Sequence, residues 1–250
     1  MQIIPVIDIK NGIAVHAKGG HRERYAALET RFADVPEPTA IIAGMLTVLK
    51  IARIYIADLD AITKSADSSA RAAADNNAMI RQLARDYPNL DFMIDSGLTV
   101  RSVLDDYLQH DNLEFVIASE TLSKLQDYNA VMTRIPATRG VLSLDRRGDR
   151  RLGPAALFER PSMWPQRVIN MNLACVGGDD GPDWDGLEAL RARCPDCHIY
   201  AAGGVRDLDD LGRLVALGTT AVLIGSALHD GRLDPAAVAK FADSAACVEP

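Results

Sequence analysis

The chain has 250 residues, 48% of them hydrophobic and 24% charged, a balance typical of globular proteins rather than of disordered or fibrous ones. Its net charge of −7 makes nucleic acid a poor partner, because the phosphate backbone needs a basic surface. No apolar run approaches the ~20 residues of a bilayer span and the first residues lack the features of a leader, so we expect a cytoplasmic protein without a membrane partner.

Eight short apolar runs, rich in β-branched residues, recur along the chain, and a helical pattern follows each. They are Ile3–Asp8, Arg53–Asp58, Leu90–Asp95, Glu114–Ala118, Gly140–Asp145, Arg167–Asn172, His198–Ala202 and Ala221–Gly225. Such alternation predicts parallel pairing, because the crossover between parallel strands is long enough to hold a helix. Eight units predict an α/β protein with one (βα)₈ TIM barrel domain over residues 1–250, and a doubly wound open sheet is the alternative.

The connections between these runs carry signals of their own. The residues from Lys18 to Pro38 begin with a polar, glycine-bearing stretch, which predicts a long loop over the mouth of a barrel. The stretch Arg206–Leu211 puts carboxylates in the first turn of a helix, where the helix dipole favours them. Asp234 followed by Pro235 predicts the N-cap and first position of a last helix, expected to run through Phe241.

Four cysteines do not indicate a disulfide framework in a chain of this length. Cys194 and Cys197 form one close pair with His198 beside it, but a structural zinc site usually has four ligands and no second pair follows. We interpret the pair as an inert helix-to-strand turn, with metal binding and a redox role as the alternatives.

Short segments of the two halves of the chain resemble each other. The segment around Gly97 (residues 95–101) resembles the segment around Gly204, and the residues before Leu122 resemble those before Leu228. In both pairs, the two similar segments are separated by nearly the same number of residues. This internal echo predicts two similar half-barrels of four βα units each.

Reactive side chains are expected where the strands end, because active sites of such barrels lie at the carboxyl ends of their strands. Asp8 ends the first predicted strand and Asp145 the fifth, so two carboxylates would face each other across the barrel as acid and base. The alternative is that each accepts N–H bonds from the loop that follows. We favour catalysis for Asp8 and Asp145, and loop capping for Asp58, Asp60 and Asp95.

Glycines follow the last two predicted strands. Gly203 and Gly204 come after the seventh strand, and Gly225 and Ser226 after the eighth. Backbone N–H groups at such turns can close on an anion, and strands seven and eight of these barrels often carry a phosphate site. These four residues therefore predict phosphate binding, and close packing of helix on strand is the alternative explanation for the glycines.

Several of these segments resemble one known family. They are Ile4–Gly12, Ala57–Ala61, Ser143–Asp145, Gly181–Pro182, Ala202–Val205 and Ile224–Leu228. Together they are similar to the HisA/HisF family of histidine-biosynthesis barrels, and most of all to its isomerase branch. The resemblance implies a barrel of the ribulose-phosphate-binding type, a substrate with two phosphates at opposite rims, and a ring-opening rearrangement. It also implies one catalytic aspartate at the end of strand one, which falls on Asp8, and another just after strand six. The strand-five aspartate of the family falls on Asp145.

The loop after strand six departs from that pattern. Val176 stands where the isomerase branch has its second acid, and Met171 where it has a threonine. Valine cannot transfer a proton, and loss of a positioned acid or base typically costs about 10²–10⁴ in rate. Efficient isomerisation would therefore need a substitute such as Asp179 or Asp180.

The second phosphate site of the family is altered as well. Asp95–Leu98 replaces a glycine-rich turn after strand three, and Ser119 with Glu120 replaces Gly-Thr after strand four. A carboxylate repels a phosphate by roughly 4 kcal/mol per charge pair at about 4 Å with an effective dielectric near 20. We therefore predict one phosphate site, in the carboxyl-terminal half, and none in the amino-terminal half.

Four further side chains are candidate substrate contacts, namely Lys10, His16, Asn172 and Cys175. His16 stands where the isomerase branch usually has an arginine. Cys175 could be a nucleophile if a nearby positive charge stabilised its thiolate, or else a small buried hydrophobe. Lys10 could pair with substrate or with Asp8, or remain solvated at the rim. The arginines at 146, 147, 150 and 151 are interpreted as surface charge, with help to an anionic substrate as the alternative.

These features predict an isomerase-like or lyase-like biosynthetic enzyme that acts through Asp8 and Asp145 on a small molecule with one phosphate. A first alternative is the phosphoribosylformimino-AICAR ribotide isomerase of histidine biosynthesis, with Asp179 or Asp180 as the missing acid. A second is a barrel without catalysis that binds a phosphorylated ligand or serves as an assembly subunit. No coenzyme is implied, because there is no dinucleotide fingerprint and the glycines follow strands seven and eight rather than the first, and we predict no metal site.

Overall fold

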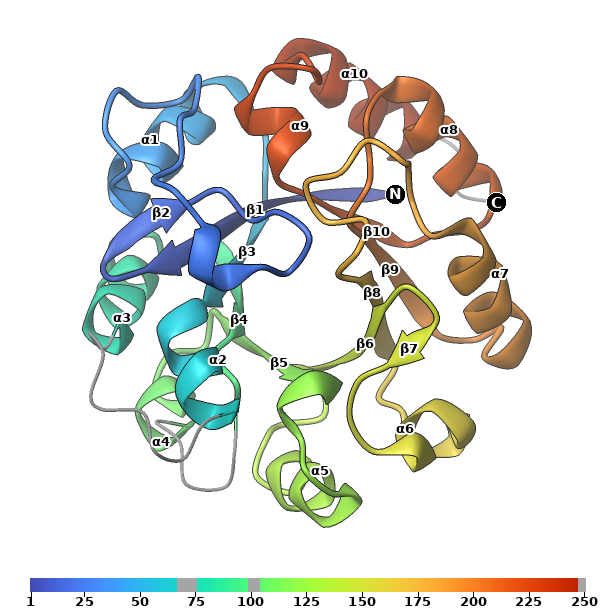
Figure 1. Cartoon of the computed structure of the whole chain (residues 1–250). Coiled ribbons are helices and arrows are strands. Elements are labelled where there is room, and N and C mark those ends of the chain that lie inside the picture. The colour runs from blue at the N-terminus through green and yellow to red at the C-terminus, as the bar shows by residue number, and fades with distance from the viewer. Residues whose placement is uncertain (67–75, 99–103, 247–250) are drawn as a thin grey trace.

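Eight parallel strands close into a barrel in the computed structural model, which describes residues 1–66, 76–98 and 104–246 (Figure 1). The barrel strands are β1 (Gln2–Lys10), β3 (Arg53–Asp58), β4 (Asp91–Asp95), β5 (Leu113–Ala118), β6 (Gly140–Arg147), β8 (Arg167–Asn172), β9 (His198–Ala202) and β10 (Ala221–Ile224). They follow one another around the barrel in this order, and β10 pairs with β1 from Gln2 opposite Ala221 to Pro5 opposite Ile224. The predicted (βα)₈ fold is confirmed, because this pairing closes a sheet that a doubly wound fold would leave open.

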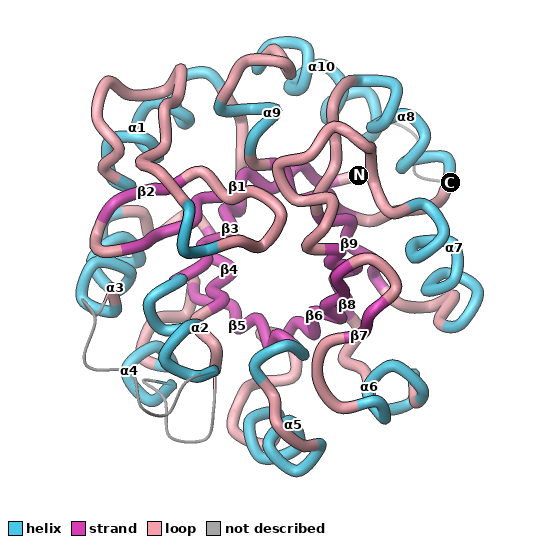
Figure 2. Tube along the Cα trace, in the orientation of Figure 1, coloured by secondary structure: helices cyan, strands magenta, loops and turns pink. Residues whose placement is uncertain are grey.

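Most helices surround the barrel as an outer ring, and two lie over its carboxyl end (Figure 2). They are α1 (Pro38–Val48), α2 (Leu59–Ala66), α3 (Asn77–Asp86), α4 (Leu104–Leu108), α5 (Leu125–Met132), α6 (Ala155–Glu159), α7 (Trp184–Arg193), α8 (Leu208–Ala216), α9 (Ser226–His229) and α10 (Pro235–Ala246). Short 3₁₀ turns are η1 (Arg22–Arg24), η2 (Ser119–Thr121) and η3 (Pro161–Met163). Each barrel strand agrees with a predicted run to within two residues at either end.

The helix ends follow the predicted chemistry. Asp207 caps α8 by accepting the N–H of Asp210 at 2.9 Å. Asp234 accepts the N–H groups of Ala236 and Ala237 at 2.9 and 3.1 Å, and Pro235 takes the first position of α10. This last helix extends to residue 246, five residues beyond the predicted end. The first echo segment follows β4, and the second follows β9, but residues 99–101 of the first lie outside the described part of the chain.

Two short hairpins were not predicted. Strand β2 (Ile13–Val15) pairs antiparallel with the end of β1, and β7 (Arg150–Arg151) with the end of β6. Each hairpin lies at the carboxyl end of a barrel strand, beside the mouth of the barrel. The predicted loop from Lys18 to Pro38 follows β2 and reaches over the barrel opening, as Figure 1 shows for the segment that carries η1.

Alternation along the strands decides which side chains point into the barrel. Ile4, Met93, Val141 and other apolar side chains fill the interior in one cluster, while their strand neighbours pack outward against the helices in a second. Glu114 lies between the guanidinium groups of Arg53 and Arg167 near the amino-terminal ends of the strands. Polar residues at the carboxyl ends of the strands line a cavity that opens at that end of the barrel.

The Cys194 and Cys197 pair lies in the predicted turn between α7 and β9, and the structure joins its two sulfurs in a disulfide. The sequence predicts an inert turn here and no disulfide framework, so this bond is a correction. The turn brings the two Cα atoms to 5.3 Å, within the range that a disulfide spans, and that proximity depends on local backbone geometry rather than on composition.

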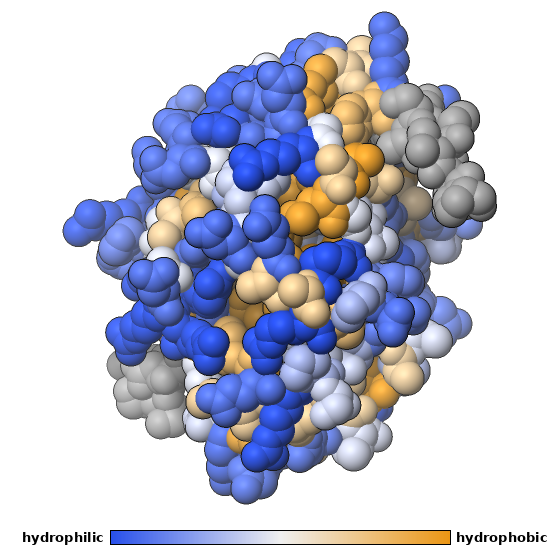
Figure 3. All heavy atoms as spheres, turned by 90° about the vertical axis from the view of Figure 1, so that its right-hand side faces the viewer, coloured by the Kyte–Doolittle hydropathy of each residue, from blue (hydrophilic) through white to orange (hydrophobic). Residues whose placement is uncertain are grey.

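Hydrophilic side chains cover most of the surface on the side of α7 and α8, with fewer apolar ones between them (Figure 3). The exposed large apolar residues of α8 are Leu208 and Val215. No helix in the described segments is long and apolar enough to cross a bilayer.

The backbone conformation at position 204 and the close approach of its neighbours require glycine there, so Gly204→Ala should destabilise the protein. Its φ is +82°, and an added Cβ would clash with the backbone oxygen of Gly181. We expect the free energy of unfolding to fall by about 2 kcal/mol or more, measured by urea denaturation. Gly212→Ala in α8 is the matched control, because nothing lies near its added Cβ and alanine favours the helix by about 1 kcal/mol. Equal unfolding midpoints for the two variants would contradict the prediction.

Candidate functional site

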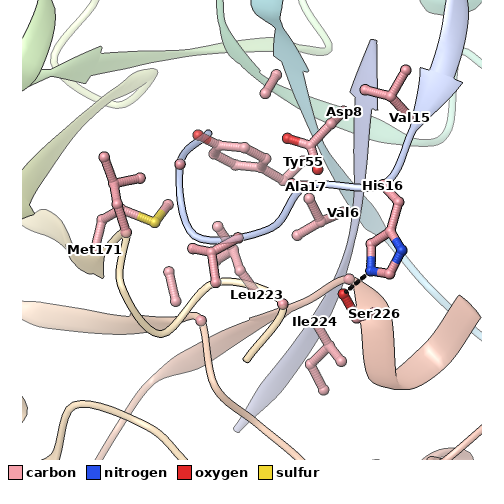
Figure 4. Close-up of a pocket in the computed structure, with 18 of the residues that line it drawn as sticks. Val6, Asp8, Val15, His16, Ala17, Tyr55, Met171, Leu223, Ile224 and Ser226 are labelled. Atoms are coloured by element: carbon pink, nitrogen blue, oxygen red, sulfur yellow. Dashed lines mark hydrogen bonds between the residues drawn. The ribbon is translucent and has the colours of Figure 1, made fainter. Parts of the chain in front are cut away.

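A cavity opens at the carboxyl ends of the barrel strands, where Figure 4 shows Asp8 and Tyr55 beside the same space as His16 and Ser226. Its charged and polar lining is divided. Strands β1 to β6 and their loops contribute Asp8, Arg22, Tyr55, Asp95, Glu120 and Asp145, whereas β9, β10 and their loops contribute Gly203, Gly204, Gly225 and Ser226. One side of the cavity is therefore rich in carboxyl groups, and the other in glycine backbone.

Asp8 points into the cavity because it follows Ile4 and Val6 on the inner face of β1. Its carboxyl makes no hydrogen bond to a described residue, and it keeps some exposed surface that a ligand can reach. Burial raises the pKa of Asp8 to about 7, although Arg22 opposes that shift and Asp95 adds to it. A carboxyl with a pKa near neutrality can both take up and release a proton at physiological pH.

Asp95 and Tyr55 form a pair beside Asp8. The Tyr55 hydroxyl donates to Asp95 Oδ2 at 3.1 Å, and the Gly97 N–H donates to Oδ1 at 3.3 Å. Burial, with the charge of Glu120, raises the pKa of Asp95 to about 6. Burial and the carboxylates around it hold the pKa of Tyr55 well above its usual range, so the phenol stays protonated and serves as a hydrogen-bond donor.

Asp145 lies in a dense set of hydrogen bonds. Ser143 Oγ donates to Asp145 Oδ1 at 2.6 Å, and Ser119 Oγ and the Glu120 N–H donate to Oδ2 at 3.1 and 3.0 Å. The bond from Glu120 holds the start of η2, as the capping alternative predicts, and the residue also lines the cavity. Burial and the neighbouring Glu120 raise the pKa of Asp145, which favours its protonated form.

Arg22 and Glu120 form an ion pair between the loop after β2 and the turn after β5. Both side chains line the cavity. The Lys10 ammonium donates to the Arg22 carbonyl oxygen at 2.7 Å, so it fixes the backbone of η1. Glu120 and Asp95 occupy the place where the family resemblance implied a second phosphate.

The glycine side of the cavity carries all four residues predicted to bind phosphate. Gly203 and Gly204 adopt φ values of +89° and +82°, and Gly225 leads directly into α9. No hydrogen bond to another described residue uses the N–H of Gly203, Gly204 or Ser226, so these donors are available to a ligand. His16 lies beside them, with Nε2 at 3.0 Å from Ser226 Oγ.

The loop after β8 places Val176 on the cavity wall and its acids outside it. Val176 lines the cavity, where the family resemblance implies an acid. Asp179 is exposed and pairs with Arg232 at 2.9 Å, and Asp180 is also exposed. Neither aspartate lines the cavity.

The other candidate side chains lie away from the cavity wall. Asn172 Oδ1 accepts the N–H groups of Gly148 and Ala174 at 3.0 and 3.2 Å, which stabilises the strand ends. Burial and nearby carboxylates raise the pKa of Cys175, which disfavours a thiolate. Lys10, Asn172 and Cys175 are not among the cavity-lining residues.

Asp58 has the capping role that we favoured for it, whereas Asp60 accepts an N–H from the turn between β1 and β2 rather than from the loop that follows it. Asp58 Oδ1 accepts the N–H of Ala61 at 3.1 Å, and Asp60 Oδ2 accepts the N–H of Asn11 at 2.6 Å. The amide of Asn76 donates to both carboxylates. Asp95, which we grouped with them, accepts the N–H of Gly97 from the loop that follows it and also lines the cavity.

Sequence reasoning missed Tyr55 and Arg22 as cavity residues. Alternation along the second predicted strand could have identified Tyr55, because it lies two residues before Ala57 on the inner face. Nothing in the loop sequence distinguishes Arg22 from the exposed Arg24. Within the described segments, no group of three or more His, Cys, Asp or Glu side chains is arranged to hold a metal ion.

Comparison with known proteins gives the same family as the sequence motifs. The family model described as "Histidine biosynthesis protein" matches residues 2–234. An uncharacterised protein of Methanocaldococcus jannaschii is 29% identical over 246 residues, covering 94% of this chain and 96% of that protein. Two relatives are named as imidazole-4-carboxamide isomerases that act on a phosphoribosyl compound. The one from Thioalkalivibrio sulfidiphilus is 25% identical, with 97% of this chain and 100% of the relative covered. The one from a Synechococcus strain is 27% identical, with 94% and 91% covered.

The match extends over nearly the whole barrel, from β1 to the start of α10. It therefore includes both the acidic side of the cavity and the glycine side. The resemblance inferred from the motifs is confirmed, and the chain belongs to the histidine biosynthesis protein family.

Proposed function

We propose that this protein is an enzyme that binds a small molecule carrying one phosphate and rearranges it by proton transfer through Asp8 and Asp145. The observation that carries the proposal is the division of the cavity. A carboxyl group with a pKa of about 7 lies on one side, and backbone N–H groups without partners among the described residues lie on the other. An anchored phosphate would hold the reacting carbons over Asp8.

The phosphate would be bound by the N–H groups of Gly203, Gly204 and Ser226, with His16 beside it. Oriented N–H groups favour an anion without needing a permanent charge. Fixing one end of the molecule turns proton transfer at the other end into an intramolecular step, which lowers its barrier.

The two carboxyl groups have different roles in this proposal. Asp8 is free of hydrogen bonds to described residues, so it can move its proton to or from a substrate atom. Asp145 is held by three donors and its raised pKa favours the acid form, so it is the candidate proton donor or hydrogen-bond donor. The Tyr55 phenol donates its one O–H to Asp95 and so fixes that carboxyl group beside Asp8. Two carboxyls with different environments can divide acid and base work between them.

The isomerase of histidine biosynthesis is the second candidate, because relatives named as imidazole-4-carboxamide isomerases match over nearly the whole chain. By the family resemblance, its substrate carries two phosphates, and its reaction needs an acid after the sixth barrel strand, which is β8. Here Val176 takes that place, Asp179 is paired with Arg232 on the surface, and Glu120 with Asp95 occupies the second rim. These replacements favour a substrate with one phosphate.

Two measurements test the proposal. Titration with glycerol phosphate, followed by phosphorus NMR, should give saturable binding at one site, and 1,4-butanediol bisphosphate should bind no more tightly than its monophosphate. Expression in a bacterial strain that lacks the isomerase should fail to restore growth without histidine. Growth that depends on Asp8, together with tight binding of the bisphosphate, would replace our proposal with the second candidate. Binding without any turnover that responds to Asp8→Asn would favour the non-catalytic alternative.

A further inference from the structure

We propose that Arg22 is a positioning residue for the proton transfer assigned to Asp8, because its guanidinium is held over the cavity as the counter-charge against which Asp8 ionises. The proposal rests on the proposed function only for the role of Asp8. Its test needs no substrate, so it can fail or succeed independently of phosphate binding.

Arg22 is fixed at both its backbone and its side chain. Lys10, two residues beyond Asp8 on β1, donates from Nζ to the Arg22 carbonyl oxygen at 2.7 Å. The guanidinium pairs with Glu120, and both side chains are largely buried, with 25% and 14% of their surfaces exposed. The N–H of Glu120 in turn donates to Asp145 at 3.0 Å. One line of contacts therefore joins the strand of Asp8 to the strand of Asp145 through Arg22.

The loop that carries Arg22 is attached to the rest of the mouth at two further points. His16 lies against Ser226 at 3.0 Å, and the N–H of Gly19 donates to the carbonyl oxygen of Val176 at 2.8 Å. The loop also passes so close to Gly177 that an added Cβ there would clash with the backbone oxygen of Ala17. Figure 1 shows this blue segment lying across the barrel opening. These attachments hold Arg22 in place above the cavity.

Positive charge is scarce around Asp8. The titratable groups that share its side of the cavity are Tyr25, Tyr55, Asp95, Glu120 and Asp145, with His16 near the other side. Among the described cavity-lining residues, only Arg22 and Arg232 carry a permanent positive charge. Arg232 pairs with Asp179 and Asp230 on surface positions. Arg22 is therefore the cation that stabilises an ionised Asp8.

The direction in which Arg22 shifts the pKa of Asp8 follows from these positions. Arg22 lowers the pKa of Asp8 against the larger opposing effect of burial. Without Arg22, Asp8 loses an opposite charge and Glu120 becomes an unpaired carboxylate near Asp95 and Asp145. Both changes disfavour a negative Asp8, so the carboxyl would hold its proton above neutral pH and could not act as a base there.

The test is a pH titration of the Asp8 carboxyl by carboxyl-carbon NMR, with its signal assigned from its absence in Asp8→Asn. In Arg22→Gln we expect the pKa of Asp8 to rise by about one unit or more, the shift typical for loss of a nearby opposite charge. Arg22→Lys, which keeps the charge, should restore most of the difference. Arg24→Gln is the matched control, because Arg24 lies two residues away on η1 with 79% of its side chain exposed.

The double variant Arg22→Gln/Glu120→Gln keeps the proposal testable if the single variant does not fold, because it leaves no unpaired carboxylate at position 120. It should also raise the pKa of Asp8, since Arg22 acts on Asp8 directly. An unchanged pKa of Asp8 in a folded Arg22 variant, or an equal rise in Arg24→Gln, would overturn the proposal. Binding of glycerol phosphate should be retained in all these variants. If the wild type itself does not bind glycerol phosphate, that result counts against the proposed function alone.

Discussion

Asp8→Asn should make the protein more stable than the wild type at about pH 8, by about 2–4 kcal/mol in the free energy of unfolding. The pKa of Asp8 rises from 3.8 to about 7 on folding, chiefly through burial. At pH 8 the folded protein therefore holds a buried carboxylate that the unfolded chain would expose to water at no cost. Asparagine has a similar shape and no charge, so the variant avoids that penalty.

The direction of the pH dependence follows from proton binding. Between about pH 4 and pH 7 the folded state binds more protons at Asp8 than the unfolded state does, so stability is greatest at low pH and decreases as the pH rises through this window. Above about pH 7 the loss is complete. Asp95, whose pKa rises to about 6, and Asp145, whose pKa is also raised, add decreases of the same sign.

Urea denaturation of wild type and variant at about pH 4.5 and pH 8 measures this difference. The two proteins should have similar unfolding free energies at the lower pH and separate at the higher one, while turnover is lost in the variant. Asp149→Asn is the control, because Asp149 is exposed in the turn between β6 and β7. A variant that is less stable than wild type at both pH values would contradict the prediction.

A stabilising Asp8→Asn would also bear on function. Residues that destabilise a fold persist where their chemistry is needed, because an active site requires groups in environments that folding alone would avoid. Three carboxyls with raised pKa values at one end of a barrel are such an arrangement.

The fold was predictable from sequence because each barrel strand combines a short apolar run with a following helix, and eight such units have one common closed solution. The runs from Arg53 and from Arg167 were predicted with the observed bounds. The hairpins β2 and β7 were missed because their pairing depends on the turn that folds a strand end back, and β7 has only two residues. The polar sequence of Arg150 and Arg151 carries no strand signal.

The site was predictable where a residue's place in a strand determines its direction. Asp8 and Asp145 end predicted strands, and the glycines follow β9 and β10, so all of them reach the same end of the barrel. Position alone did not identify the partners of each carboxyl. The hydrogen bonds of Asp145 come from β5 and η2, and the charge opposite Asp8 comes from a loop. Such contacts between segments distant in sequence arise only on folding.

Ser226→Asp should abolish phosphate binding, which is the second large effect that we expect. Ser226 lines the glycine side of the cavity, next to Gly225 and within hydrogen-bond distance of His16. A carboxylate at this position would repel a phosphate by roughly 4 kcal/mol per charge pair at about 4 Å, with an effective dielectric near 20. The affinity for glycerol phosphate should therefore fall by about 10²- to 10³-fold.

Ser226→Asn is the matched control, because it has nearly the shape of aspartate without the charge. It should keep the affinity within about tenfold of wild type, since the N–H groups that hold the phosphate belong to the backbone. Both affinities can be measured by isothermal titration calorimetry near neutral pH. If the aspartate variant binds as well as wild type, the phosphate does not lie between Gly203 and Ser226. A phosphate held by backbone N–H groups should respond more strongly to an added negative charge than to the loss of one hydroxyl. If both variants lose binding equally, the Ser226 hydroxyl itself binds the phosphate, and the prediction is wrong.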